Sequence, residues 1–110
     1  MRRVGIAVVD GVSMLPTLRP GDRLLVRYGA SPSLGRLALV ALPDRPLSVK
    51  RLGSVDADGW WVERDNPREG ADSWSLGRAV APDDVVAVVV GRLWPRPSLL
   101  RRGGSAVAAR

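Results

Sequence analysis

The chain has 110 residues, which is enough for one small domain with a single hydrophobic core. Hydrophobic residues make up 45% and charged residues 25%, a balance typical of a globular protein, and the formal net charge is +6. Because cysteine and histidine are both absent, disulfides, thiol nucleophiles and the usual transition-metal ligands are excluded, and we expect no metal and no cofactor.

Short strand-like segments, separated by turns rich in Gly, Pro and Asp, follow one another along the chain. No segment of ten or more residues shows a clean helical period, and the turn Asp56–Gly59 predicts a hairpin. The pattern predicts an all-β domain, built as coiled antiparallel sheets or a partly closed barrel. In chain order the predicted strands are Arg3–Val9, Arg23–Tyr28, Arg36–Pro43, Leu47–Asp56, Trp60–Asp65, Gly77–Val80 and Asp84–Trp94.

The character of the chain changes after Trp94, where Pro, Gly and small residues become frequent. We therefore expect one folded domain at residues 1–95 and a flexible C-terminal tail at residues 96–110. The apolar run Val4–Val9 is too short for the core of a signal peptide, and no apolar run approaches the roughly 20 residues that span a bilayer. The sequence accordingly predicts a cytoplasmic protein without a membrane span.

The stretch "GVSMLPTLRPGDRLLV", residues Gly11–Val26, places one serine in a tight turn. Gly11 before Ser13 and Pro16 after it favour an irregular backbone that exposes the serine side chain together with its backbone N–H. These local residues leave two interpretations open. Ser13 is either an ordinary turn residue or a nucleophile that the turn presents.

All but one of the 17 basic residues are arginine, and the single lysine, Lys50, lies in a strand-like run. Alternate residues of a strand face opposite sides, so Lys50 shares a face with Leu52, while Val49 and Arg51 share the other. A lysine can lose its proton when burial disfavours the ammonium, whereas an arginine cannot. Lys50 is therefore either a general base for the serine in the preceding turn or a surface lysine.

Four segments, taken in order, resemble the conserved boxes of signal peptidase I and of the wider family of LexA-like Ser–Lys peptidases. The nucleophile box is matched by the stretch around Ser13, the general-base box by the run around Lys50, and a third box by an Asp-Asn and Asp-Ser pattern. A Gly-Arg strand closes the set. The four segments are "SMLPTLRPGDRLLV" (Ser13–Val26), "VKRLG" (Val49–Gly53), "DNPREGADSWSLG" (Asp65–Gly77) and "VVGRLWP" (Val89–Pro95).

This resemblance implies an all-β catalytic core and a serine endopeptidase with a Ser–Lys dyad. Ser13 Oγ would attack the scissile carbonyl, neutral Lys50 would take the hydroxyl proton, and the Ser13 backbone N–H would serve the oxyanion hole. Val12 and Met14 would contact the substrate. A further set of residues would support the site structurally: Pro16, Asp65, Asn66, Asp72 and Ser73.

Three positions depart from better-known members of the family. Gly11 stands where some relatives carry a serine of the oxyanion hole, so a second donor would come from the backbone. Gly70 stands where many relatives have a serine that orients the lysine, and Trp74 replaces the arginine that normally pairs with the aspartate, here Asp72.

A small, free-standing core of this kind resembles the nickel-type superoxide dismutase maturation protease of actinobacteria. The expected partner is a precursor protein that loses a short N-terminal leader, above all the nickel superoxide dismutase precursor. One alternative is a signal-peptidase-like or LexA-like processing protease with another substrate.

The other alternative is a non-catalytic basic β-barrel module that binds nucleic acid through its arginines. Single-strand binders of that kind present stacked aromatic residues on a basic groove. Here the arginines are scattered, and the adjacent Trp60 and Trp61 point to opposite faces of a strand. We therefore expect no nucleic-acid partner.

Overall fold

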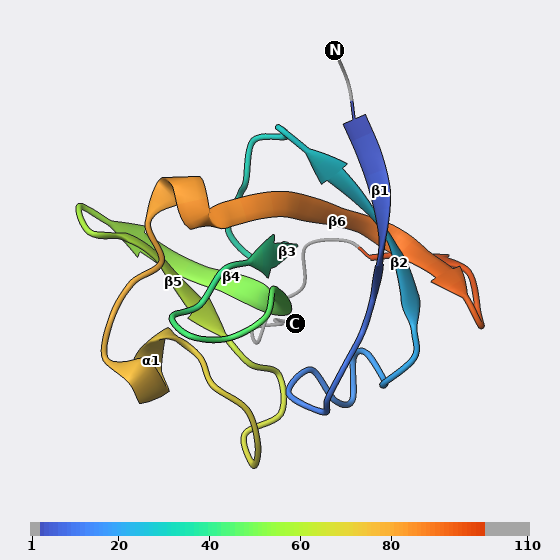
Figure 1. The fold of residues 1–110 in the computed structure, drawn as a ribbon, viewed down its shortest axis with the longest axis horizontal. Coiled ribbons are helices and arrows are strands. Elements are labelled where there is room, and N and C mark those ends of the chain that lie inside the picture. The colour runs from blue at the N-terminus through green and yellow to red at the C-terminus, as the bar shows by residue number, and fades with distance from the viewer. Residues whose placement is uncertain (1–2, 101–110) are drawn as a thin grey trace, which may run out of the picture.

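The computed structural model describes residues 3–100, and within them the chain folds as antiparallel β-structure with almost no helix (Figure 1). The predicted all-β class is confirmed. The elements, in chain order, are β1 (Arg3–Val8), β2 (Arg23–Tyr28), β3 (Leu37–Val40), β4 (Ser48–Asp56), β5 (Gly59–Glu63), α1 (Ser73–Leu76), the 3-10 turn η1 (Pro82–Asp84), β6 (Val85–Trp94) and β7 (Ser98–Leu99). None of the helices in this described part is long and apolar enough to cross a bilayer.

The strands form one coiled sheet in the order β1-β2-β6-β3-β4-β5, and β7 adds to β6. Every pairing is antiparallel, and the long strand β6 links the two halves through its pairings with β2 and β3. Register shifts interrupt both of these pairings, and such irregularities bend a strand and let a sheet curl. The sheet remains open, with β1 and β5 at its edges.

Two hydrophobic clusters fill the opposite faces of the sheet. Because side chains alternate along a strand, β3 supplies Leu37 and Leu39 to one cluster and Ala38 and Val40 to the other. Strand β4 does the same with Val49 and Leu52, which confirms that these two residues face opposite sides. The first cluster comprises Val9, Met14, Leu18, Leu24, Val26, Leu37, Leu39, Val49, Ala87 and Val89, and the second comprises Ala38, Val40, Leu42, Leu52, Val62 and Val80.

The hairpin predicted at Asp56–Gly59 is present, since these two residues are partners at the turn between β4 and β5. The strand predicted at Gly77–Val80 is reduced to one bridge between Val80 and Trp60. Gly77 instead ends helix α1 in a left-handed conformation, with φ of 74°.

Part of the predicted C-terminal tail, residues 98–100, has a defined place in the structure. Ser98–Leu99 forms β7 against β6, and Leu100 packs on the first hydrophobic cluster. Because residues 98–100 form only a short run after Pro95 and Pro97, their sequence has too little alternation of polar and apolar residues to indicate a two-residue strand. Residues 101–110, the rest of that predicted tail, lie outside the described residues.

Gly59 offers a test of how tightly the hairpin packs. Its φ is +128°, and a Cβ placed there would lie 2.2 Å from the carbonyl oxygen of Val80. We expect Gly59→Ala to lower the free energy of unfolding by roughly 1–3 kcal/mol or more, measured by denaturant unfolding. Gly29→Ala is the matched control, because Gly29 also has positive φ, of +74°, but a Cβ there meets nothing within 4 Å. Equal losses in the two variants would contradict the close contact.

Candidate active site

Ser13 lies early in the loop that connects β1 to β2. Hydrogen bonds of 2.9 Å from Val9 N to Asp22 O and of 2.8 Å from Gly21 N to Val9 O close the base of this loop. Just after the serine, Met14 is 2% exposed and packs in the first hydrophobic cluster. The loop is thus fixed at its base and beside Ser13, so the turn holds the hydroxyl in one place.

Lys50 lies on β4 and is 3% exposed. Its Nζ lies 2.6 Å from Ser13 Oγ and donates a hydrogen bond to it across 37 residues of sequence. Burial lowers the pKa of Lys50, because the ammonium loses its water; nearby Asp72 opposes this by raising the pKa, and the cations Arg45 and Arg64 lower it. The structure therefore brings the predicted nucleophile and base into contact, with an amine that is easier to deprotonate than an ordinary lysine.

Asp72 is held in place by its role at the start of α1. Its Oδ1 accepts a hydrogen bond of 2.9 Å from Ser75 N, which makes it the N-cap of the helix. Its Oδ2 accepts a bond of 3.2 Å from Arg64 N and lies 4.0 Å from Arg64 Nε. Arg64 is thus the arginine that pairs with Asp72 in this structure, although the sequence has Trp74 at the expected arginine position. The Trp74 ring packs against Trp61, with centroids 4.6 Å apart.

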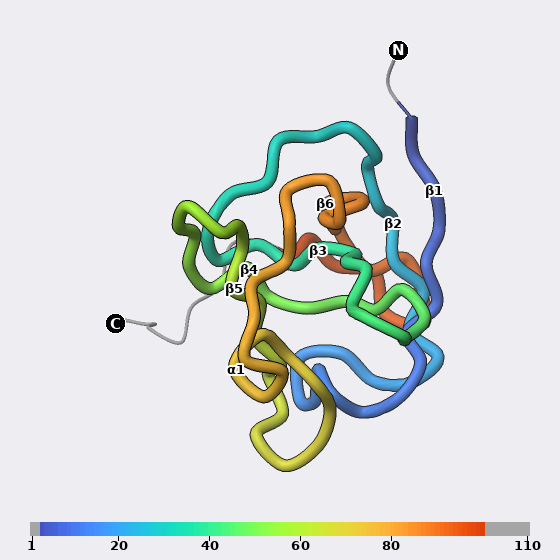
Figure 2. Tube along the Cα trace, turned by 60° about the vertical axis from the view of Figure 1, so that its left-hand side comes forward, coloured from blue at the N-terminus to red at the C-terminus, as the bar shows by residue number. Residues whose placement is uncertain are grey.

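The segment after β5 is connected to the loop that carries Ser13, between β1 and β2, by Asn66 and Asp65. Figure 2 shows these two segments side by side at one end of the sheet. Asn66 donates from its backbone N to Ser13 O at 2.8 Å and from Nδ2 to Val12 O at 2.9 Å. Asp65 accepts two hydrogen bonds from Arg51, at 2.9 and 2.7 Å. Asp65 Oδ2 also accepts one from the Thr17 hydroxyl, at 2.5 Å.

Two other predicted support residues lie further from the dyad. Ser73 is fully buried, and its Oγ accepts a hydrogen bond of 2.8 Å from Val62 N, so it attaches α1 to β5. Pro16 follows a cis peptide bond and lines a different cavity, together with Thr17 and Arg92. Neither residue lines the cavity that contains Lys50.

Gly70 has a steric reason for lacking a side chain. Its φ is +106°, and a Cβ there would lie 2.3 Å from the Cβ of Ser13. The backbone of Gly70 is therefore packed directly against the Ser13 side chain, and a serine at position 70 would collide with it. Gly11 also has positive φ, of +81°, but a Cβ there meets nothing within 4 Å.

Two cavities open beside Ser13. The larger has a volume of about 400 Å³ and is lined by Val12, Ser13, Lys50 and Gly70 among others. The smaller, of about 40 Å³, lies between the end of β1 and the start of β4, and Met14 forms part of its wall. The two residues predicted to bind substrate, Val12 and Met14, thus lie at different cavities.

Ser48 lines both cavities, and sequence reasoning missed it. Its Oγ is buried and has no hydrogen-bond partner within residues 3–100. Its position two residues before Lys50 places both side chains on the same face of β4. That spacing was a signal available in the sequence, but nothing there indicated that the hydroxyl would be buried and unpaired.

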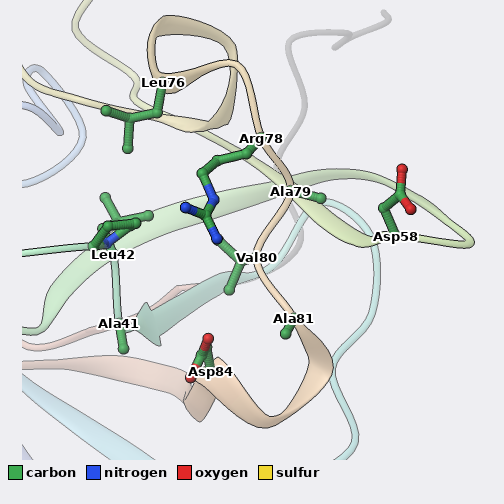
Figure 3. Close-up of a pocket in the computed structure, with 10 residues that line it drawn as sticks. Ala41, Leu42, Asp58, Leu76, Arg78, Ala79, Val80, Ala81 and Asp84 are labelled. Atoms are coloured by element: carbon green, nitrogen blue, oxygen red, sulfur yellow. The ribbon is translucent and has the colours of Figure 1, made fainter.

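A third cavity, of about 360 Å³, lies apart from the dyad and adjoins the larger cavity only through Leu42. Figure 3 shows the Arg78 side chain entering it, with Leu42 and Leu76 on one side and Asp58 and Asp84 at other points around it. The part of the chain that the structure describes has no cluster of three or more carboxylates placed to hold a metal ion.

Lys50 can be titrated alone, because it is the only lysine in the chain. In protein labelled with ¹⁵N- and ¹³C-lysine, the folded chain should titrate at lower pH than the urea-unfolded chain, whose midpoint should lie near 10.5. Between the two midpoints the unfolded chain binds more protons, so the contribution of Lys50 to stability rises with pH across that window. Equal midpoints would contradict the burial of the amine.

Comparison with known families accounts for most of the chain. Residues 2–89 match the family described as Peptidase S24-like, and this range includes both Ser13 and Lys50. Searches among curated proteins and among solved structures return no match. Because the matched range covers well over half of the chain, the protein belongs to the Peptidase S24-like family, whose members are serine peptidases of the LexA and signal peptidase type.

Proposed function

We propose that this chain is a serine endopeptidase in which Ser13 is the nucleophile and Lys50 is the general base. The observation that carries the proposal is the 2.6 Å contact between Lys50 Nζ and Ser13 Oγ. Its setting adds support, since Lys50 is 3% exposed and the contact borders a cavity of about 400 Å³. A cavity of that size is in the usual range for a substrate site.

The reaction follows from these atoms. When the amine is neutral, its lone pair accepts the Ser13 hydroxyl proton while Oγ bonds to the scissile carbonyl carbon. The C–N bond then breaks, Lys50 returns the proton to the leaving amine, and an ester on Ser13 remains. Water, deprotonated by Lys50, attacks the carbonyl carbon of that ester; the C–O bond to Ser13 then breaks, Lys50 returns the proton to Ser13 Oγ, and the acid is released. Each cycle consumes one water and restores both side chains.

Stabilisation of the oxyanion falls to backbone donors. Within residues 3–100 the Ser13 N–H donates no hydrogen bond, so it is free to bind a developing oxyanion. One such donor contributes on the order of 3 kcal/mol to transition-state stabilisation. The buried Ser48 hydroxyl lies on the Lys50 face of β4 but, within the described residues, makes no hydrogen bond to the amine.

The substrate would bind as an added strand. β1 is an edge strand, and within the described chain the first three residues of β4 pair only with β3, because β5 begins its pairing at Arg51. These two unpaired edges flank the small cavity beside Ser13, which takes its walls from residues 8–10 and 47–49. An extended peptide lying between them would satisfy both edges with main-chain hydrogen bonds.

The natural substrate that we propose is an N-terminal leader on the nickel superoxide dismutase precursor. The support for it is the sequence resemblance to the maturation protease, together with a small cavity that suits a residue such as alanine before the cut. If this precursor is not processed, the remaining proposal is a signal-peptidase-like or LexA-like protease that processes another precursor.

Co-expression with the superoxide dismutase precursor tests this proposal through the intact mass of the product. We expect leader loss with the wild-type chain, and at least about a thousandfold slower loss with Ser13→Ala or Lys50→Ala. Lys50→Arg should not restore processing, because the guanidinium stays charged. Ser31→Ala, at an exposed serine, is the control and should process normally. Normal processing by Lys50→Ala would rule out the dyad.

The small cavity makes a separate prediction about the residue before the cut. We expect alanine to be preferred over leucine there, and Leu47→Ala, which removes part of the wall, to narrow that preference by about tenfold. Mass spectrometry of mixed peptide substrates would measure the ratio. Leu34→Ala is the control, because Leu34 is 45% exposed and lines neither cavity beside Ser13. An unchanged alanine-to-leucine ratio in Leu47→Ala would mean that the substrate residue before the cut does not bind in the small cavity.

A further inference from the structure

Arg64, which directly follows β5, contacts three groups around the dyad without touching either member of it. Its Nη1 donates a hydrogen bond to the carbonyl oxygen of Gly70, and its Nη2 donates one of 3.3 Å to that of Pro67. Its Nε lies 4.0 Å from Asp72 Oδ2, and the side chain is 26% exposed. A single guanidinium thus links the loop beside Ser13 to the carboxylate near Lys50.

The contact with Gly70 bears on the position of the nucleophile. Gly70 is packed so closely on Ser13 that an added Cβ would come within 2.3 Å of the serine Cβ. A shift of Gly70 would therefore leave a gap behind the serine side chain or press against it. Because Arg64 holds the Gly70 carbonyl, it helps to set the wall against which the hydroxyl rests.

The contact with Asp72 bears on the charge of the base. Asp72 favours the ammonium form of Lys50 and raises its pKa, while Arg64 opposes that effect and lowers the pKa. An arginine paired with the carboxylate therefore acts twice, by its own charge and by offsetting the charge of Asp72. The charged groups that face the Lys50 amine are Asp72, Arg45 and Arg64, with Asp10 and Glu69 on the rim of the same cavity.

We propose that Arg64 is a positioning residue, which holds Gly70 against the Ser13 side chain and pairs with the Asp72 carboxylate. The catalytic meaning of this arrangement rests on the dyad proposed above, but the arrangement itself can be tested without any substrate. The position of this arginine in the sequence is unexpected, since Arg64 directly precedes the box Asp65–Gly77, in which the family pattern would place the arginine at Trp74.

The titration of the single lysine tests the electrostatic half of the proposal. In lysine-labelled protein, Arg64→Gln should move the Lys50 midpoint to higher pH than in the wild type. Arg64→Lys adds a second lysine, so its two amine signals are assigned separately, and the Lys50 midpoint should move less in that variant. Below the midpoint, each unit of such a rise removes about nine-tenths of the neutral amine. Arg68→Gln is the matched control, because it removes the same charge from the same loop at an exposed side chain that is not among the groups acting on Lys50. An unmoved midpoint in Arg64→Gln would overturn the proposal.

A double-mutant comparison isolates the pairing with Asp72. Asp72→Asn, which keeps the ability to cap α1, should move the Lys50 midpoint to lower pH. In the Asp72→Asn background, Arg64→Gln should shift the midpoint less than it does in the wild type, because there is no carboxylate left to offset. Equal shifts in both backgrounds would show that the pairing has no role.

Backbone amide spectra test the positional half. Arg64→Gln should move the amide signals of Ser13 and Gly70, whereas Arg68→Gln should leave both unchanged. Unmoved signals in Arg64→Gln would overturn the positioning role. If Arg64→Gln loses the folded spectrum, Arg64→Lys and Asp72→Asn decide the matter by the directions given above.

The proposed function can fail separately from this inference. If the dyad is catalytic, the pH at which leader removal reaches half of its maximal rate should follow the Lys50 midpoint in each variant. A midpoint that moves while processing does not follow would support the role of Arg64 in setting the lysine and would count against Lys50 as the base.

Discussion

The burial of one lysine amine beside one serine hydroxyl is the interaction on which the site depends. An ammonium removed from water is costly, and at Lys50 that cost is reduced when the amine gives up its proton. Strand β4 provides the burial, because Lys50 is paired with β3 at Ala38 and its side chain meets the loop that carries Ser13. The same desolvation that makes the position unfavourable for a charge makes the residue suitable as a base.

Neighbouring residues hold the Ser13 and Lys50 side chains in contact. The loop after β5 is attached to the turn that carries Ser13 by Asn66, and its next part is packed on Ser13 through Gly70. The lack of a side chain at Gly70 is thus a steric requirement of this site. A hydroxyl-bearing side chain at position 70 would have no room, and the buried hydroxyl of Ser48 lies on the Lys50 face of β4.

The open sheet and the dyad belong to one arrangement. The coil leaves one edge of β1 and one edge of the first residues of β4 without a strand partner in the described chain, and residues of both strands line a small cavity that Ser13 also lines. A sheet that closed completely would have satisfied those edges internally and left no place for an added strand. Exposed Val4, Ile6 and Val8 on β1 show that this edge is apolar as well as unpaired.

The order of residues by itself determined the all-β class, most strand positions, the hairpin at Asp56–Gly59 and the two faces of β4, because alternation and turn chemistry are local properties. A resemblance in four boxes also pointed to Ser13 and Lys50 before any contact was known. Only the tertiary structure decided which groups lie in contact: the 2.6 Å contact between Ser13 and Lys50, the steric role of Gly70 and the pairing of Arg64 with Asp72. These contacts depend on strand register, on the bulges of β6 and on the path of two loops, which side-chain periodicity does not encode. For the same reason the periodicity gave no sign of the two-residue strand β7, since its pairing partner on β6, not its own sequence, makes it a strand.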